Sequence, residues 1–172
     1  MFKTRILALL FLLAFQASFA QIEPYKIFDG KGKEVTFENI VKDSKKSEVI
    51  FYGELHNNSI AHWLQLQLLK NLQENGNKVI LAGEFFERDD QLNIEDWFAG
   101  KMTDKNFEAE AKLWNNYQVD YKPMMLFAKK NNIPFVGTNV PRKYASMVSR
   151  KGLSVLDSLS DEAKKSIAPL PI

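Results

Sequence analysis

Three short apolar runs, separated by segments with helical periodicity, organise the chain. The runs cover residues 48–52, 78–82 and 133–138 and are rich in β-branched or aromatic residues. Nearly continuous apolar character over so few residues is typical of buried parallel strands. Residues 60–74 carry apolar side chains at three- and four-residue spacing, which predicts a helix between the first two strands. The alternation predicts an α/β fold, with a parallel central sheet and helices on both of its faces.

Turn and capping residues locate the remaining elements. Residues 25–28 and 34–37 flank a glycine-rich turn and predict a small N-terminal β-hairpin at the edge of the fold. Residues 117–121 are a polar, aromatic segment that we interpret as a connector. Helix starts are indicated by residues suited to a cap or a first turn, namely Thr103, Pro123, Pro141 and Ser160.

The start of the chain has the pattern of a secretory signal. Lys3 and Arg5 precede an apolar run over residues 6–15, and small residues at 18 and 20 suit a signal peptidase. The run is shorter than the roughly 20 residues that span a bilayer, although an uncleaved anchor is the alternative. We therefore expect a signal peptide over residues 1–20 and a mature chain without a stable membrane span.

Charge and cysteine content narrow the class of protein. The chain has 23 basic and 21 acidic residues, so loss of Lys3 and Arg5 leaves a mature net charge of zero. No basic block remains that would favour nucleic-acid binding. The chain has no cysteine, which excludes disulfides and a lipidated cysteine after the signal. We expect a free periplasmic or secreted protein whose residues 21–172 form one domain.

Polar side chains follow each of the three predicted strands. Glu54 and His56 come after the first strand, Glu84 after the second, and Asn139 and Arg142 after the third. Parallel strands share one carboxyl edge, where open α/β sheets bind ligands. We therefore expect these groups to converge on one crevice. Taken singly, each has a structural alternative, since a glutamate at such a place also caps a neighbouring helix.

Aromatic and sulfur-containing side chains are expected at the same edge. A phenol at the mouth of a cleft serves as a ligand or a hydrogen-bond donor, and an apolar wall suits a flat cofactor such as haem. The methionines and His62 have a simpler interpretation as core residues. The residues concerned are Tyr52, Tyr117, Tyr121, Tyr144, Met124 and Met125.

Four blocks of sequence together resemble a known family. They are Gly53-Glu54-Leu55-His56 followed by asparagine, the segment 83–91, the segment 114–123 and the segment 133–142. Their order and spacing resemble those of the ChaN-like haem-binding proteins, within the Tiki and erythromycin-esterase-like superfamily. The resemblance covers most of the mature chain.

The resemblance implies an α/β fold and a role in bacterial haem or iron acquisition, in partnership with an outer-membrane uptake system. It also implies that haem binds at the interface of a homodimer with tyrosine ligation of the iron. Tyr121 is the expected ligand because it lies in the best-matching aromatic segment. The other residues expected around the haem are His56, Glu54, Glu84, Tyr117, Asn139 and Arg142.

Two departures from the family leave alternatives open. Chains of this family continue past the point where this one ends, so we expect a C-terminally incomplete domain. Metal-dependent proteases of the superfamily use a Gly-x-x-His motif in each half, and only residues 53–56 supply one here. A hydrolase would hold a divalent metal through Glu54, His56 and Glu84, a set too small for autonomous catalysis. A non-catalytic interaction domain is the third hypothesis.

Overall fold

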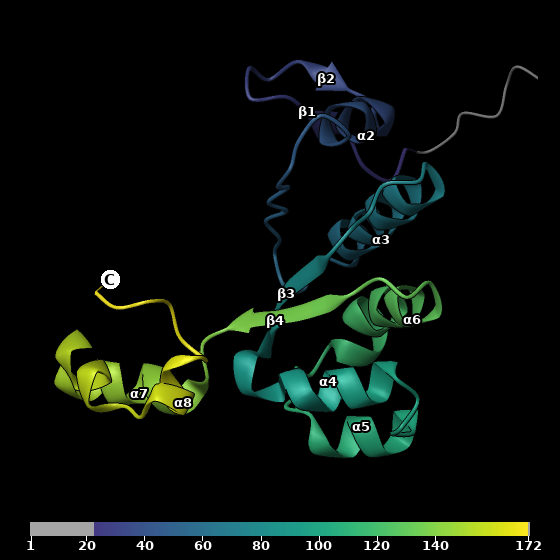
Figure 1. The fold of residues 1–172 in the computed structure, drawn as a ribbon. Helices are drawn as coiled ribbons and strands as arrows, with labels where there is room; N and C mark the ends of the chain where they lie inside the picture. Colours follow the sequence, from purple (N-terminus) through teal and green to yellow (C-terminus); the bar gives the residue numbers. More distant parts are fainter. Residues whose placement is uncertain (1–22, 172) are drawn as a thin grey trace, which may run out of the picture. The chain divides into compact units, whose positions relative to one another are not determined.

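In the computed structural model, the described residues are 23–171 (Figure 1). The chain divides into two compact units, the first ending at Ile40 and the second beginning at Val41. The predicted signal peptide, residues 1–20, lies outside the described residues.

The predicted N-terminal hairpin is confirmed. Strand β1 (Ile27–Phe28) pairs antiparallel with β2 (Glu34–Val35). Asp29 closes the turn between them, because its Oδ1 accepts hydrogen bonds from the backbone N–H groups of Lys31 and Lys33, both at 2.9 Å. Hydrogen bonds of this kind, from the following backbone N–H groups to an aspartate side chain, stabilise a tight turn in which the hydrogen bonds between the two strands cannot continue.

The parallel sheet is also confirmed. Strand β3 (Leu81–Glu87) pairs in parallel with β4 (Phe135–Asn139), and Gly83 lies opposite Gly137. A Cβ at Gly137 would lie 3.0 Å from the carbonyl oxygen of Glu87, so the close approach of the two strands favours glycine there.

The second strand begins and ends later than residues 78–82, which is a correction to the predicted bounds. The apolar run continues through Phe85 and Phe86, which are buried, and pairing therefore extends to Glu87. As a result, Glu84 lies inside β3 and not after its end. The register between Gly83 and Glu87 is irregular, consistent with a β-bulge at this point.

The segment 48–52 does not form the predicted strand. Its residues have no strand assignment, and the Phe51 side chain is 95% exposed. A strand is stable only where a neighbouring strand or a packed face receives it. Here a cavity separates the segment from β3, so its β-forming composition has no ladder to join.

Helices follow the predicted order. The predicted caps are present at α5 and α8, where Thr103 and Ser160 accept hydrogen bonds from the backbone N–H groups three residues on. Within residues 23–171, no helix combines the length and apolar character needed to cross a membrane. The helices are α2 (Phe37–Ser44), α3 (Ser59–Glu74), α4 (Gln91–Phe98), α5 (Asp104–Glu110), α6 (Lys122–Lys130), α7 (Arg142–Lys151) and α8 (Asp161–Lys164).

The segment Tyr117–Tyr121 is a π-helical turn rather than a polar connector, and both of its tyrosines are buried. Single π-helical turns recur at functional sites, where they redirect side chains. The turn leads directly into α6, so its tyrosines face the same core as the helix.

The core lies between β3–β4 and the helices α4, α5 and α6 (Figure 1). Its largest side chains have at most 1% of their surface exposed, and those of α4 and α5 meet where Trp97 stacks on Phe107 with ring centroids 4.2 Å apart. Among residues 23–171, the largest fully buried side chains are those of Trp97, Tyr121, Phe86, Phe107, Ile94, Met125 and Pro141.

Candidate haem site

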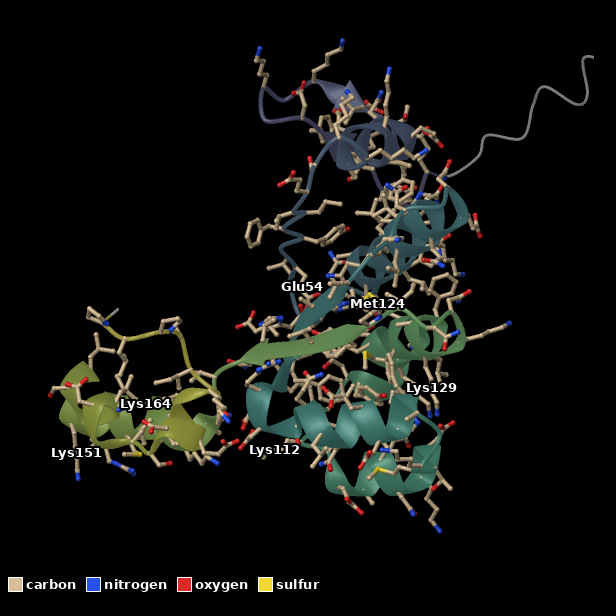
Figure 2. All side chains as sticks on the ribbon, viewed as in Figure 1. Glu54, Lys112, Met124, Lys129, Lys151 and Lys164 are labelled. Atoms are coloured by element: carbon tan, nitrogen blue, oxygen red, sulfur yellow. The ribbon has the colours of Figure 1, made fainter. Side chains whose placement is uncertain are left out.

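A cavity of about 720 Å³ lies between the segment 48–56 and strand β3, within the second unit. Cavities of this size are typical of small-molecule and cofactor sites. Figure 2 shows Glu54 and Met124, two of its lining residues, beside β3. The apolar lining includes Leu68, Leu69, Leu72, Val79, Leu81, Phe85 and Met124, and the polar lining includes Tyr52, Glu54, His56, Gln65 and Glu84.

Glu54 is the centre of a hydrogen-bond network at one wall of this cavity. The Tyr121 hydroxyl donates to Glu54 Oε1 at 2.5 Å, and Gln65 Nε2 donates to Oε2 at 2.6 Å. Burial by itself would raise the pKa of Glu54, but the hydrogen bonds from Tyr121, Gln65 and His56 outweigh it and lower the pKa. Glu54 is therefore held as an anionic acceptor.

His62 supports the same wall from α3. It is 3% exposed, its Nδ1 lies 3.2 Å from Glu54 Oε2, and its Nε2 lies 3.1 Å from the backbone oxygen of His56. Both ring nitrogens therefore face oxygen acceptors. His62 is therefore a buried residue whose ring lies between protein oxygens, in agreement with its interpretation as a core residue.

The backbone beside His56 is fixed from a second direction by the π-helical turn. Asn116 Nδ2 donates to the His56 carbonyl oxygen at 2.6 Å and to Asp120 Oδ2 at 2.9 Å. Ser59 Oγ donates to Asp120 Oδ1 at 2.9 Å. Asn58 caps α3, since its Oδ1 accepts from the N–H groups of the second and third residues after it. The turn that carries His56 is thus tied both to α3 and to residues 116–120.

The His56 side chain itself is 60% exposed and faces the cavity. Its Nδ1 lies 3.2 Å from Glu54 Oε1, and its ring packs edge-on against Trp114 with centroids 4.8 Å apart. A carboxylate on one nitrogen and an aromatic edge beside the ring together restrict its orientation.

Tyr121 lies behind Glu54 and not in the cavity lining. It is fully buried, and its ring stacks on Phe85 with centroids 4.2 Å apart. Burial first, and then the hydrogen bond to Glu54, raise the pKa of the Tyr121 phenol, which keeps the hydroxyl protonated. Its role as an iron ligand stays a prediction.

The predicted convergence on one crevice holds for Glu54, His56 and Glu84, which all line the cavity. Asn139 and Arg142, which were expected in the same crevice, and Tyr117, which was expected near the haem, lie outside the lining of this cavity. Tyr117 is buried in the core, whereas Asn139 ends β4 and Arg142 begins α7. Because β3 runs on to Glu87, which pairs with Asn139, the carboxyl edge of the sheet lies beyond the position of Glu84.

Comparison with protein-family models matches residues 40–172 to the family described as "Haem-binding uptake, Tiki superfamily, ChaN". The chain belongs to the ChaN family. The matched region contains every residue that lines the cavity. No curated protein and no solved structure gives a significant match.

The cavity of this ChaN-family chain fits a haem in its chemistry. The walls contributed by α3 and β3 are mostly aliphatic or aromatic, as a porphyrin face requires, although each also contributes one polar residue, Gln65 and Glu84. Further polar groups line the cavity, among them Glu54, His56, Glu48 and Lys78. The lining thus includes an exposed imidazole, which is among the common protein ligands of haem iron.

Several residues of the site in this ChaN-family chain were not expected from the sequence. Gln65 lies three residues after His62 on α3, so both side chains lie on the same face of the helix. This spacing could have identified Gln65 as a residue of the site. Trp114 and Asn116 reach residue 56 only through the tertiary fold, and no local signal marks them.

The carboxyl edge carries a separate ion-pair cluster. Lys112 Nζ lies 2.8 Å from both Glu87 Oε2 and Asp89 Oδ1, and Lys143 Nζ lies 3.1 Å from Asp89 Oδ2 (Figure 2 labels Lys112). Among residues 23–171, no group of three or more His, Cys, Asp or Glu side chains is arranged to hold a metal ion.

The lowered pKa of Glu54 predicts acid sensitivity. Its ordinary value is 4.5, so the stabilisation from its ionised form is complete above about pH 5 and is lost as the pH falls through the lower folded-state value. Urea unfolding of the wild type and Glu54→Gln from about pH 6 to pH 3 should give stabilities that approach each other at low pH, because a protonated carboxyl resembles an amide. A difference that stays constant with pH would contradict this.

Proposed function

We propose that this ChaN-family protein binds haem in the cavity between the segment 48–56 and β3. The observation that carries the proposal is this cavity of about 720 Å³, with mostly apolar walls from α3 and β3 and an exposed imidazole in its lining. Family membership supports haem as the ligand. Apolar burial of the porphyrin and an iron–protein bond are the two contributions that such a site supplies.

The cellular role that we propose is haem or iron acquisition by an exported bacterial protein that works with an outer-membrane uptake system. The basic and apolar pattern of residues 1–20 supports export to the periplasm or beyond. A homodimer is part of the proposal, and the exposed apolar side chains near the cavity support it. Phe51 is 95% exposed, Leu55 is 70% exposed and Ile80 is 68% exposed, and contact with a second copy would remove them from water.

Titration of the purified protein with haemin tests the proposal. We expect a shifted Soret band that saturates at a fixed haem-to-chain ratio, because the cavity transfers the porphyrin from water to an apolar wall. A spectrum identical to that of free haemin would contradict it.

A blocking variant locates the bound haem. Ala82 is exposed on β3 and lines the cavity, so Ala82→Trp fills the cavity with little disturbance of the core. We expect the haem affinity to fall by about tenfold or more, which is about 1.4 kcal/mol. The matched control is Ala109→Trp, at an exposed position of α5 outside the cavity lining, which should bind like the wild type. Equal affinity of both variants would place the haem elsewhere.

A further inference from the structure

We propose that Lys78 binds a propionate carboxylate of the haem, so that the propionate edge of the porphyrin lies at the Lys78 end of the cavity, away from Glu54 and Glu84. This inference rests on the proposed function and adds how the site recognises and orients an anionic porphyrin. It concerns the carboxylates at the edge of the ring and is independent of which residue binds the iron.

Charged side chains are distributed unevenly over the cavity lining. Among the lining residues, all of which belong to the described part of the chain, Lys78 is the only lysine or arginine. Glu48, Glu54 and Glu84 contribute carboxylates to the same lining. Haem carries two propionate carboxylates, and a like charge close to either of them weakens binding. Lys78 is therefore the position at which a propionate gains a charge-assisted hydrogen bond.

The β3 side of the cavity separates Lys78 from Glu84. The lining follows the chain without a break over residues 77–85, so Lys78 lies near one end of this wall and Glu84 near the other. Within β3, the three residues from Leu81 to Glu84 span about 10 Å, and Lys78 is three residues further back along the chain. A propionate at Lys78 therefore avoids the carboxylate of Glu84.

The α3 side of the cavity separates Lys78 from Glu54 in the same direction. Gln65, in the first half of α3, donates to Glu54 at 2.6 Å. Leu72, near the end of α3, accepts a hydrogen bond from the backbone N–H of Asn77 at 3.1 Å, which places it beside Lys78. The rise of the helix from Gln65 to Leu72 is about 10 Å. Both walls therefore run from a carboxylate at one end, past apolar side chains, to Lys78 at the other.

Lys78 is available to an anionic ligand. Its side chain is exposed, and within residues 23–171 no hydrogen bond or ion pair engages it. Lys112, by contrast, lies 2.8 Å from two carboxylate oxygens. Asn77 also lines the cavity and adds an amide that can donate to the same propionate. Glu48 is exposed to water and forms no ion pair with Lys78, so it leaves the ammonium group free.

Esterified haemin tests the inference. Haemin dimethyl ester keeps the ring and the iron but has no propionate charge, so it isolates the contribution of the carboxylates. We expect Lys78→Gln to weaken haemin binding roughly three- to tenfold in absorption titrations and to leave binding of the ester unchanged. Lys105→Gln, at an exposed position of α5 outside the lining, is the matched control and should bind both porphyrins like the wild type. Wild-type affinity of Lys78→Gln for haemin, or an equal loss for haemin and its ester, would overturn the inference.

Glu84→Gln tests the orientation. Glu84 is exposed, so this variant is expected to fold, and circular dichroism checks that it does. With the propionates at Lys78, removal of the Glu84 charge should change the affinities for haemin and for its ester by the same factor. A gain confined to haemin would place the propionates beside Glu84 and overturn the inference while leaving haem binding intact. A wild type that binds neither porphyrin would overturn the proposed function itself.

Discussion

Glu54→Ala is expected to reduce haem affinity roughly 10–100-fold and to lower the free energy of unfolding by about 2–4 kcal/mol. The carboxylate accepts from Tyr121 and Gln65 and lies 3.2 Å from Nδ1 of both His56 and His62. Its removal leaves the hydroxyl of Tyr121, which is fully buried, without an acceptor. Haem affinity falls for a different reason, because His56 loses the group that orients its ring.

Two variants make this result specific. Glu54→Gln keeps an acceptor oxygen of the same shape and should lose less stability than Glu54→Ala, while still weakening haem binding through loss of the charge. Glu110→Ala removes an exposed carboxylate at the end of α5 and should leave both quantities within about 0.5 kcal/mol of the wild type. Absorption titration and urea unfolding measure the two effects separately. Unchanged stability in Glu54→Ala would show that Glu54 does not hold the buried network together.

Trp97→Ala is expected to cost about 3–5 kcal/mol of unfolding free energy, a large part of the total stability of a domain. The indole is 1% exposed and stacks on Phe107 with ring centroids 4.2 Å apart. Its Nε1–H donates to Asp104 Oδ1 at 2.7 Å, and Lys129 Nζ lies 4.5 Å from the ring centroid (Figure 2 labels Lys129). Truncation therefore leaves a cavity between α4 and α5 and removes a side-chain hydrogen bond.

Trp63→Ala is the matched control, because it removes the same side chain from a position that is 49% exposed on α3. It should cost clearly less than Trp97→Ala in chemical denaturation followed by circular dichroism. Equal losses of unfolding free energy in the two variants would mean that the packing of α4 on α5 contributes less to stability than the burial of Trp97 indicates. Since Trp97 does not line the cavity, the fraction of Trp97→Ala that remains folded should bind haem with wild-type affinity.

These predictions separate two parts of the second unit. The core of α4, α5 and α6 supplies stability through apolar contacts that involve no ligand. The wall of Glu54, His62 and Asp120 is polar, is held by side chains from α3 and the π-helical turn, and borders the cavity. Buried polar networks specify a unique geometry when all of their members are satisfied, which is what a ligand-orienting wall needs.

The sequence predicted the elements whose signals are local. Helical periodicity and the caps at Thr103 and Ser160 depend only on residues within a few positions of each other, and these predictions were confirmed. The hairpin was found for the same reason, since Asp29 bonds the backbone of its own turn. The segment 48–52 was predicted as a strand from its composition, but a strand also needs a neighbouring strand, and composition says nothing about whether one is present.

For the site, the sequence placed Glu54 and His56 together because they are two residues apart after a glycine. It grouped them with Glu84, and the cavity lining contains all three. It did not predict that Tyr121 would donate to Glu54, since the two are 67 positions apart in the chain. Asn139 and Arg142 were also grouped with the site, because Glu84 was expected to follow the end of its strand as they follow the end of theirs. Strand β3 instead extends past Glu84 to Glu87.

The sequence by itself determined the membership of the ChaN family, the alternation of strands and helices, and the pairing of Glu54 with His56. Each of these depends on short-range patterns of residues or on the order of such patterns along the chain. Only the tertiary structure decided which aromatic group is exposed and which is buried. Burial depends on what long-range packing brings against a side chain, and packing places Phe85 against Tyr121 and leaves His56 facing the cavity. As a result, the Tyr121 hydroxyl donates to Glu54 inside the core, whereas the His56 imidazole lines the cavity.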